Sequence, residues 1–541
     1  MAKRVAVIGG GAAGLVATKT CLEEGLEPTC FDRRDSLGGL WVFDEKVEEN
    51  LSCCMSSTML NTSKEILAFS DFPMPKEFPN FMHNRQGLEY LQRYALNFKL
   101  DKFTRLSTEV VKVTRAADFV TSGKWTVISK NLKSRDTMTE VFDAVLVCSG
   151  HHGAKHIPKL PGLNEFKGQI LHSHDYRRPG DVTGKRVLVV GLGNSGGDIA
   201  SELSLSKEVI MSTRRGAWVL TRQGTRGIPW DIEMYTRIGG LVDKMLPESL
   251  SQAILAAYFW ARLDHDMYGL TSTALPKGIS GFLSDDLANR ILCGRVRIRD
   301  DIKRFAESSV EFVDGTVEDV DVVIFATGYH IRFPFIEKEV LDVQENVMRL
   351  YKRVFLPDLE HQTLAFIGFF NVNGALWPFF ELQSRMAVYA MTGVIKLPTS
   401  RKIKEDIREM ENKRAQISPD TLRHTIEGIW FPYMEELAEV IGCKPNIWRL
   451  LLTDPKLGLK VLFGPVLGAH YRLQGPGQWS GARQSILTAM DRVRFPFQTR
   501  KIPSGLPRSF NLVRRLLYPS ILQMLVLYFA LVVLLVLVFF V

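Results

Sequence analysis

The stretch RVAVIGGGAAGLVATKTCLEEGLEPTCFD, residues 4–32, decides the fold of this chain. The apolar run at residues 5–8 predicts a buried strand of a parallel sheet, and the residues after it have the pattern of a helix. Gly9, Gly11 and Gly14 stand between the two in G-x-G-x-x-G spacing. The first glycine allows a tight turn, the second lets the backbone approach a pyrophosphate, and the third lets the helix pack closely on the strand. This order of strand, turn and helix predicts a dinucleotide-binding site.

An acidic residue completes this unit. A second strand is predicted at residues 28–31, and Asp32 follows it directly. A carboxylate at the end of that strand can accept hydrogen bonds from both hydroxyl groups of a ribose. The N-terminus of the helix offers free N–H groups and a partial positive charge to phosphates. We expect the first cofactor site to contain Gly9, Gly10, Gly11, Ala12, Ala13, Gly14 and Asp32.

The same pattern returns at residues 185–200, KRVLVVGLGNSGGDIA. The position that Asp32 takes in the first unit is taken in the second by Arg214, which Arg215 follows. An arginine can bind a ribose 2′-phosphate through two parallel hydrogen bonds, whereas an acid suits a free 2′-hydroxyl. The first site is therefore predicted to bind FAD and the second NADPH, unless the arginines are only a surface pair on a structural repeat. The second site is expected to contain Gly191, Gly193, Asn194, Ser195, Gly196, Gly197, Asp198, Arg214 and Arg215.

Two further buried strands, predicted within residues 142–150 and 321–328, end in small residues and fit the return strand that each nucleotide-binding unit needs. We therefore predict an α/β fold with two Rossmann-like nucleotide-binding domains, one inserted in the other, together with a helical insert and a C-terminal transmembrane helix. The predicted parts are the FAD-binding domain (1–155 and 331–445), the NADPH-binding domain (156–213 and 296–330), the helical insert (214–295), a C-terminal region (446–510) and a membrane anchor (511–541).

The composition limits the partners of the protein. The chain has 541 residues, of which 46% are hydrophobic and 23% charged, and this suits a globular protein of several domains. Its net charge of +9 favours anionic ligands or a membrane surface, and without a basic low-complexity run no nucleic acid is expected. Seven scattered cysteines without a C-x-x-C pair predict no metal site and fit a reduced, cytosol-facing body.

The C-terminal end, residues 521–541, is almost wholly apolar, and about 20 such residues span a bilayer. Arg514 and Arg515 precede it and place that end of the span in the cytosol. A buried core helix is the alternative for this segment. Another helix, predicted at residues 247–263, carries a broad aromatic and aliphatic face, which fits either a second membrane contact or an ordinary lid or core helix.

A linker between the two nucleotide units carries the motif FKGQILHSHDY at residues 166–176, of the form F-x-G-x-x-x-H-x-x-x-Y/F. With this motif, both glycine fingerprints and stretches such as NTSKE, FATGY and GPGQWSGAR, the chain closely resembles the vertebrate microsomal flavin-containing monooxygenases, which are class B flavoprotein monooxygenases. The resemblance implies that FAD, NADPH and O2 take part, and that a C4a-hydroperoxide of the flavin transfers oxygen to soft nucleophiles such as amines and sulfides. Val42 and residues 52–57 and 271–283 depart from the family pattern and leave the substrate range open.

The resemblance also assigns residues near the flavin. It implies that Asn61 contacts both flavin and nicotinamide and helps to hold the hydroperoxide, since an amide donates and accepts at once. A cap on its own turn is the alternative role for this residue. Leu60 and Thr62 are expected to touch the cofactors and Leu40 and Trp41 to lie near FAD, although core packing would also explain Trp41. No catalytic triad or pair of acids is expected, because the flavin supplies the chemistry.

Other activities share most of these residues. Oxygen insertion beside a ketone, of the Baeyer–Villiger type, and an NADPH oxidase that only releases H2O2 remain open on the same scaffold. A flavin disulfide reductase would need a redox C-x-x-C or C-x4-C pair near the flavin, and the sequence lacks both spacings. The resemblance implies an enzyme of xenobiotic metabolism at the endoplasmic reticulum membrane, anchored at its C-terminus with its body facing the cytosol. Small lipophilic substrates and membrane lipid are thus the expected partners, and a homodimer is left open.

Overall fold

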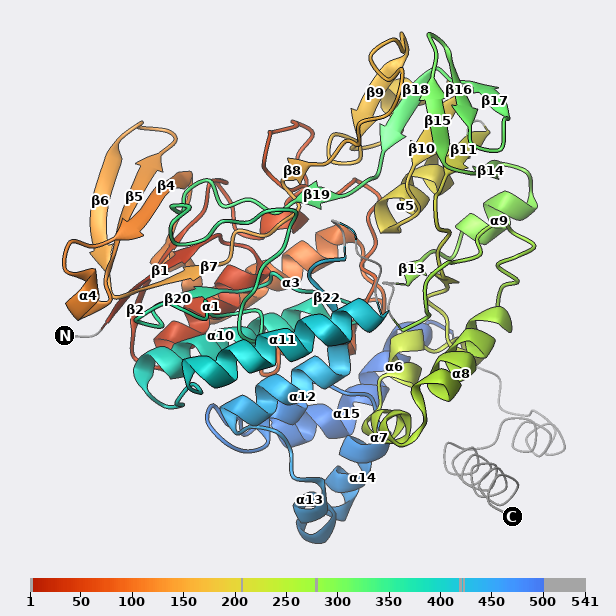
Figure 1. The fold of residues 1–541 in the computed structure, drawn as a ribbon. Coiled ribbons are helices and arrows are strands. Elements are labelled where there is room, and N and C mark those ends of the chain that lie inside the picture. Colours follow the sequence, from red (N-terminus) through yellow and green to blue (C-terminus); the bar gives the residue numbers. More distant parts are fainter. Residues whose placement is uncertain (1–2, 206–207, 278–280, 418–420, 422–423, 501–541) are drawn as a thin grey trace, which may run out of the picture. The chain divides into compact units, whose positions relative to one another are not determined.

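The fold is built on two parallel sheets, described here for residues 3–205, 208–277, 281–417, 421 and 424–500 of a computed structural model. The first sheet contains, in spatial order, β20 (Leu364–Phe366), β7 (Ala144–Val147), β1 (Arg4–Ile8), β2 (Glu27–Phe31) and β3 (Thr104–Arg105), all parallel (Figure 1). The strand β1 lies at the centre of this sheet, and the chain passes from its carboxyl end directly into the first glycine loop. This is the edge at which open α/β sheets bind nucleotides.

The second sheet repeats this plan with β14 (Val296–Arg299), β11 (Val209–Ser212), β10 (Val187–Val190), β18 (Val322–Phe325) and β9 (Gln169–His172), again all parallel. The central strands β10, β11 and β18 are buried along their whole length, as a sheet covered on both faces requires. The strand β10 leads into the second glycine loop as β1 leads into the first. The two predicted Rossmann-like units are thus both present.

The second sheet is inserted in the first. Strand β20 returns to the first sheet only after every strand of the second sheet has been formed. The chain enters and leaves the inserted unit through β8 (Ala154–Lys155) and β19 (Tyr329–His330), which pair antiparallel. These crossings lie close to the limits expected for the NADPH-binding domain, while the exact domain boundaries stay a prediction.

Helices cover the first sheet. The helix α1 (Ala12–Glu23) is buried over its first ten residues, 12–21, and packs against α10 (Leu376–Thr392), which also contacts α12 (Trp430–Ile441). Two hydroxyls in this buried helix need partners, and Thr18 and Thr20 find them in the carbonyl oxygens one turn earlier. Further helices are α3 (Asn84–Asn97) and α11 (Ser400–Ile417).

Small elements complete both domains. Antiparallel strands border the first sheet as β4 (Thr108–Arg115), β5 (Trp125–Asn131) and β6 (Thr137–Phe142), and the second as β15 (Ile302–Phe305), β16 (Ser309–Phe312) and β17 (Val317–Asp319). The remaining short elements are η2 (Leu100–Phe103), α4 (Phe119–Ser122), η3 (Gly180–Val182), η4 (Thr225–Gly227), β21 (Asn371–Val372) and β22 (Glu427–Gly428).

The regular elements of the insert between β11 and β14 are mainly helices, joined by loops. It contains β12 (Val219–Leu220), α6 (Trp230–Met234), α7 (Arg237–Met245), α8 (Glu248–Trp260), β13 (Phe282–Leu283) and α9 (Leu287–Leu292). The helix predicted within residues 247–263 is confirmed as α8. The helix α9 contacts α5 (Asn194–Leu203) and leads into β14, so it is the crossover helix of the second sheet although it falls within the range predicted for the insert.

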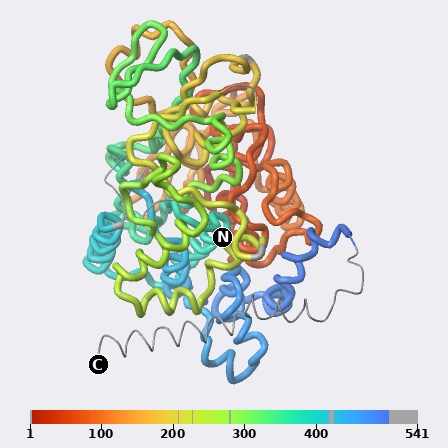
Figure 2. The backbone as a smooth tube through the Cα atoms, turned by 90° about the vertical axis from the view of Figure 1, so that its right-hand side faces the viewer, coloured from red at the N-terminus to blue at the C-terminus, as the bar shows by residue number. Residues whose placement is uncertain are grey.

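The C-terminal region adds α13 (Ile447–Thr453), α14 (Pro455–Phe463), η5 (Gly468–Arg472) and α15 (Ala482–Arg494). Figure 2 shows α13 and α14 at one end of the compact unit formed by residues 1–493 and the second sheet at its other end. A separate unit begins at Arg494, and its described part contains η6 (Phe495–Phe497). Within the described ranges, no helix is long and apolar enough to cross a membrane. The predicted anchor at 511–541 and its transmembrane helix lie outside the described residues.

Candidate active site

The first glycine loop has the geometry of a phosphate cradle. Gly9 has a φ of +111°, and a Cβ on Gly14 would lie 1.7 Å from the Gly9 carbonyl oxygen, so a side chain at Gly14 would break the turn. Gly11 begins α1 without a side-chain cap, and Ala12 and Ala13 form the buried first turn. The first N–H groups of the helix are therefore left for a ligand, as phosphate binding requires.

Asp32 lies against this loop. Its carboxylate accepts hydrogen bonds from the N–H groups of Gly10 at 2.5 Å and of Arg34 at 2.7 Å. Burial raises the pKa of Asp32, and these two N–H groups act in the opposite direction. The same two N–H groups hold the carboxylate at the end of β2, where we expect a group that accepts hydrogen bonds from the ribose hydroxyls. Loop, helix terminus and acid therefore fit an adenine dinucleotide with a free 2′-hydroxyl.

The second loop copies the first. Gly191 has a φ of +107°, and a Cβ on Gly196 would lie 2.1 Å from the Gly191 carbonyl oxygen. Gly193 begins α5, again without a side-chain cap, and Ser195 is exposed in the first turn. This arrangement fits a second pyrophosphate.

Two residues predicted to bind the second cofactor contact the insert. A Cβ on Gly197 would lie 1.6 Å from the ring of Phe282, and the side-chain oxygen of Asn194 accepts a hydrogen bond from Leu283 N at 3.3 Å. Both contacts are with β13. The close approach of Phe282 alone explains the glycine at position 197, so a direct contact of that residue with NADPH stays a prediction.

The expected 2′-phosphate site follows β11. Arg214 and Arg215 are exposed, and neither guanidinium has a hydrogen-bond or ion-pair partner among the residues that the structure describes. Asp198, in the first turns of α5, is half-buried, and this burial raises its pKa to about 7. The two arginines are thus available to an anion at the position where the first domain has Asp32.

Asn61 is bound to the insert. Its side-chain oxygen accepts a hydrogen bond of 2.6 Å from Arg222 Nη2, across 161 positions of sequence. Arg222 also pairs with Asp285 at 2.9 Å, and its charge acts on Asp198 of the second nucleotide unit. This arginine therefore holds the Asn61 turn against the insert and lies close enough to Asp198 for its charge to act on that acid. Its role could not be predicted from the sequence, because a single arginine in an insert has no spacing that signals it.

A second buried group of the insert holds the same turn. Asp231, which is 1% exposed, accepts a hydrogen bond of 2.6 Å from the backbone N–H of Ser63. Burial raises the pKa of Asp231 to about 6 against the effect of its N–H donors. Burial of an ionisable carboxyl group costs free energy, and the hydrogen bond of Asp231 fixes the backbone two residues after Asn61.

The short helix α2 (Lys64–Leu67) follows this turn and is anchored by two buried charges. Lys64 Nζ donates to the carbonyl oxygens of Lys76 and Phe78 at 2.7 and 2.6 Å, and burial lowers the pKa of this lysine to about 8. Glu65 accepts a hydrogen bond of 2.6 Å from Arg492 of α15. The C-terminal region is therefore part of the support of the Asn61 turn.

The remaining residues predicted near the flavin lie around this turn. Leu40 and Trp41 belong to η1 (Gly39–Trp41) and are half-buried, and Trp41 makes an edge-to-face contact with Trp377 at 6.2 Å. Leu60 is buried, and the hydroxyl of Thr62 donates to the Gly374 carbonyl oxygen at 3.4 Å. Their contacts with cofactors stay predictions.

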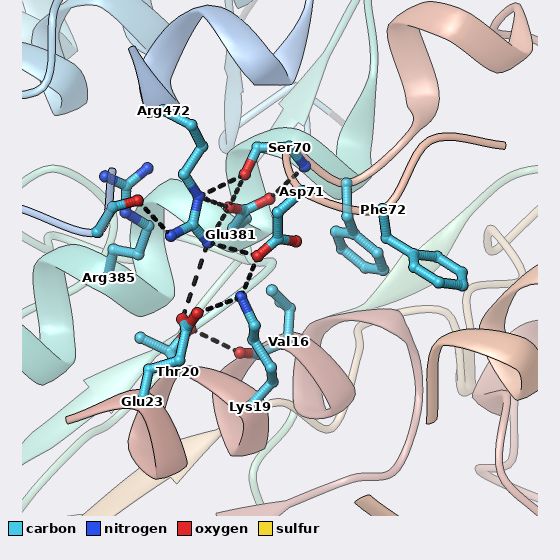
Figure 3. Close-up of polar contacts among 12 residues, drawn as sticks. Val16, Lys19, Thr20, Glu23, Ser70, Asp71, Phe72, Glu381, Arg385 and Arg472 are labelled. Atoms are coloured by element: carbon cyan, nitrogen blue, oxygen red, sulfur yellow. Dashed lines mark hydrogen bonds and ion pairs between the residues drawn. The ribbon is translucent and has the colours of Figure 1, made fainter. Parts of the chain in front are cut away.

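A buried ionic cluster ties the two halves of the FAD-binding domain together (Figure 3). Arg472 of η5 pairs with Glu381 of α10 at 2.8 Å and with Asp71 at 3.2 Å, and its Nε donates to Ser70 Oγ at 2.7 Å. Lys19 of α1 also pairs with Asp71. The helix that begins at the first glycine loop is thus connected with the segment that follows the Asn61 turn.

Comparison with known proteins shows the family. The family described as "Flavin-binding monooxygenase-like" matches residues 2–536. Flavin-containing monooxygenase 5 of Cavia porcellus is 47% identical over 503 residues, which are 92% of this chain and 94% of that protein. Dimethylaniline monooxygenase [N-oxide-forming] 2 of Macaca mulatta is 42% identical over 518 residues, covering 95% of this chain and 96% of its own.

A solved structure agrees with these relatives. The S-allyl-L-cysteine S-oxygenase of Allium sativum superimposes with a TM-score of 0.63 at 26% identity, over 92% of this chain and 99% of its own. Both glycine loops, the uncapped helix termini above them and the matched family point to one kind of enzyme. The chain belongs to the flavin-binding monooxygenase-like family and is a flavin-containing monooxygenase that uses FAD and NADPH.

Proposed function

We propose that this enzyme uses NADPH and O2 to oxygenate small lipophilic amines and sulfides, with the turn at Asn61 as the place of oxygen transfer. One observation carries the proposal. Arg222 donates to Asn61 at 2.6 Å, and its charge acts to lower the pKa of Asp198 beside the second glycine loop, which supports a meeting of the two cofactors at this turn. An oxygenase that reduces a flavin with a nicotinamide needs such a meeting point.

FAD, when bound, supplies the redox chemistry that takes electrons from NADPH and activates O2. The chain positions the reactants. The first loop and Asp32 hold the adenine dinucleotide, and the second loop with Arg214 and Arg215 selects the phosphorylated nicotinamide cofactor. Because the side-chain oxygen of Asn61 already accepts from Arg222, the amide NH2 group of Asn61 remains to donate to an oxygen atom at the flavin.

The proposed substrate class is that of amines and sulfides, because the names of similar proteins mention one substrate of each kind. One relative forms an N-oxide of dimethylaniline and a solved neighbour oxygenates the sulfur of S-allyl-L-cysteine. Ketone oxygenation and simple release of H2O2 are the alternatives on the same scaffold. Product analysis separates the three activities, since they yield an N- or S-oxide, an ester, or peroxide alone.

The test of Asn61 is the coupling between NADPH consumption and product. Asn61→Ala should retain FAD, raise the H2O2 formed per NADPH and lower sulfoxide formed from an aryl methyl sulfide. Thr58→Ala serves as the matched control and should stay coupled, because among the described residues the hydroxyl of Thr58 bonds only to Met55 N, from which it accepts. Unchanged coupling in Asn61→Ala would remove this residue from the oxygenation site.

We further propose that the enzyme is anchored by residues 521–541 in the endoplasmic reticulum membrane, with its body in the cytosol, and that helices of the body add a second contact. Large apolar side chains are exposed on α7 and on α13, among them Met245 (83%), Trp448 (80%) and Leu452 (84%). The helix α14, which packs against α7, adds the exposed Lys456 and Lys460. Apolar side chains beside lysines fit the surface of an anionic membrane.

Truncation after Arg508 isolates this second contact. The truncated enzyme should sediment with vesicles that contain phosphatidylserine and be released by high salt. The same truncated enzyme with Trp448→Ser and Leu452→Ser should stay in the supernatant. Leu96→Ser, at an exposed apolar residue of α3, is the matched control and should sediment normally. Absence of the truncated enzyme from the vesicle pellet at low salt would reject the second contact and leave the terminal segment as a simple tether.

A further inference from the structure

Two adjacent cysteines lie beside the segment that leads away from the first cofactor loop. Cys54 N donates to the Leu40 carbonyl oxygen at 3.1 Å, and Asp44 N donates to Cys53 Sγ at 3.4 Å. Cys53 is partly exposed, whereas Cys54 is buried. The pair is thus bound at both residues to the segment that runs from η1 to Asp44, and the first of the two residues is partly open to solvent.

Two buried guanidinium groups lie near the pair. The guanidinium of Arg177, which is 6% exposed, donates to three backbone carbonyl oxygens, of Asp44 at 2.7 Å, His174 at 2.6 Å and Tyr176 at 3.3 Å. No carboxylate among the described residues lies within ion-pair distance of it. A buried cation without an acidic partner favours a negative charge in its neighbourhood.

A second guanidinium reinforces this field. Arg34 is also buried and donates to the Ser52 carbonyl oxygen at 2.7 Å, one residue before Cys53. Two features oppose the thiolate. The charge of Arg34 also acts on the buried carboxylate of Asp32. Three carbonyl oxygens, of Cys54, Val42 and Asp44, lie at 3.3 to 3.7 Å from Cys53 Sγ and can accept from the neutral thiol.

The balance favours the thiolate at Cys53. The adjacent Cys54 thiol, the N–H of Asp44 and the charges of Arg177 and Arg34 lower the pKa of Cys53 against the effect of burial. The Cys54 thiol also donates to the Trp41 carbonyl oxygen at 3.9 Å. The same thiol contact, together with burial, raises the pKa of Cys54. One thiol is therefore prepared as a nucleophile, and its neighbour keeps its proton while Cys53 carries a negative charge, which is lost when Cys53 is oxidised.

We propose that Cys53 is a peroxide-reactive thiolate and that Cys54 resolves its oxidised form, which makes the pair a reversible modification site. The Cys53 sulfur attacks H2O2, the O–O bond breaks, and a sulfenic acid and hydroxide form. The Cys54 sulfur then attacks the sulfenic sulfur, the S–O bond breaks, and a disulfide and water result. In total, two thiols are oxidised by two electrons and one peroxide is reduced to two molecules of water.

The disulfide so formed should be easily reduced again. Consecutive Cα atoms are about 3.8 Å apart, which is closer than the usual span of a disulfide, about 4.4–6.8 Å, and a strained disulfide is reduced more readily. Its formation must shift the backbone that bonds to Leu40 and Asp44. Gly39, beside Leu40, faces the first loop, since a Cβ on Gly11 would lie 3.4 Å from Gly39 Cα. Oxidation should therefore weaken FAD retention until a reducing thiol restores the pair.

This regulatory consequence rests on the proposed function, because uncoupled turnover would supply the peroxide beside the flavin. The reactivity of the pair does not, because peroxide can be added to the enzyme at rest. Failure of the coupling test on Asn61 and failure of the thiol test below are therefore distinguishable.

The first experiment compares Cys53 with Cys293, an exposed free thiol of the same chain. The full-length enzyme in detergent is treated with limiting iodoacetamide, and both cysteine-containing peptides are quantified by mass spectrometry. Because the lowered pKa of Cys53 leaves more of it ionised than of an ordinary thiol, we expect about tenfold faster alkylation of Cys53 at about pH 6, even after correction for its weaker nucleophilicity. Alkylation of Cys53 no faster than of Cys293 would overturn the proposal.

The second experiment adds H2O2. In the wild type the peptide with both cysteines should lose two hydrogen atoms and regain them with dithiothreitol. Cys54→Ser should instead yield a sulfenic acid at Cys53 that dimedone traps, and Cys53→Ser should yield neither product. Trapping at Cys54 in Cys53→Ser, or no disulfide in the wild type, would contradict the assigned roles.

Discussion

Removal of the charge of Arg472 should strongly destabilise the FAD-binding domain. Arg472 is 2% exposed, and Arg472→Met keeps much of its volume while it leaves Glu381, which is 1% exposed, and Asp71 without their guanidinium partner. Breaking a buried ion pair in this way costs about 3–5 kcal/mol. Because Lys19 still pairs with Asp71 and its charge still acts on Glu381, we expect the lower end, about 3 kcal/mol.

The pH dependence identifies the cause. Burial raises the pKa of Glu381, but the charges of Arg472, Lys19 and Arg385 hold it at about 2. The ionised carboxylate therefore stabilises the wild type at any pH above the ordinary titration range of a glutamate. This contribution is lost as the pH falls towards about 2. In the variant without Arg472, the pKa of Glu381 in the folded protein should rise above its value in the unfolded chain. Ionisation of Glu381 then destabilises the fold as the pH rises. The deficit of the variant should therefore be larger at about pH 8 than at about pH 5.

The assay is urea unfolding of the full-length enzyme, followed by the fluorescence of released flavin. Arg483→Met, which removes an exposed pair with Asp454 in the same region, is the matched control and should cost less than about 1 kcal/mol. The double variant Arg472→Met with Glu381→Leu should recover part of the loss, because no buried carboxylate is then left unpaired. If Arg472→Met unfolds like the control at both pH values, the assignment of a buried ionic cluster is wrong.

Two further outcomes are expected. Replacing Arg214 and Arg215 by Ala should raise the Michaelis constant for NADPH about ten- to a hundredfold, which corresponds to roughly 1.5–3 kcal/mol, and leave that for NADH nearly unchanged in steady-state kinetics; equal losses would reject the 2′-phosphate site. Since burial raises the pKa of Asp231 to about 6, its ionisation costs stability as the pH rises towards that value. Asp231→Asn should therefore be at least as stable as the wild type at neutral pH yet release more H2O2 per NADPH, and a variant that is less stable but fully coupled would contradict a positioning role.

Local patterns explain what could be predicted from the sequence. The glycine loops and the acid at Asp32 were predictable because strand, turn and helix are consecutive in the chain. The helix α8 was predictable from its apolar face, although the pattern could not say which of its residues pack inside the insert. The nested order of the two sheets followed from the return strands.

Long-range partners explain what could not be predicted. The bond between Arg222 and Asn61 joins residues that are 161 positions apart, and the bond between Ser63 and Asp231 joins residues 168 apart. Such contacts depend on how the insert packs on the first domain, and no spacing rule encodes them. In the same way, Gly197 fits the fingerprint of a cofactor loop, yet in the folded chain it makes room for Phe282.

The most direct test of the central claim is the fate of the oxygen atoms. The full-length enzyme with FAD, NADPH and an aryl methyl sulfide is allowed to react under isotopically labelled dioxygen, and the product is analysed by mass spectrometry. We expect a sulfoxide that carries one labelled oxygen atom for nearly every NADPH consumed, and a fall in this ratio for Asn61→Ala. Unlabelled sulfoxide, or NADPH consumption that yields only H2O2 in the wild type, would contradict an oxygenase function.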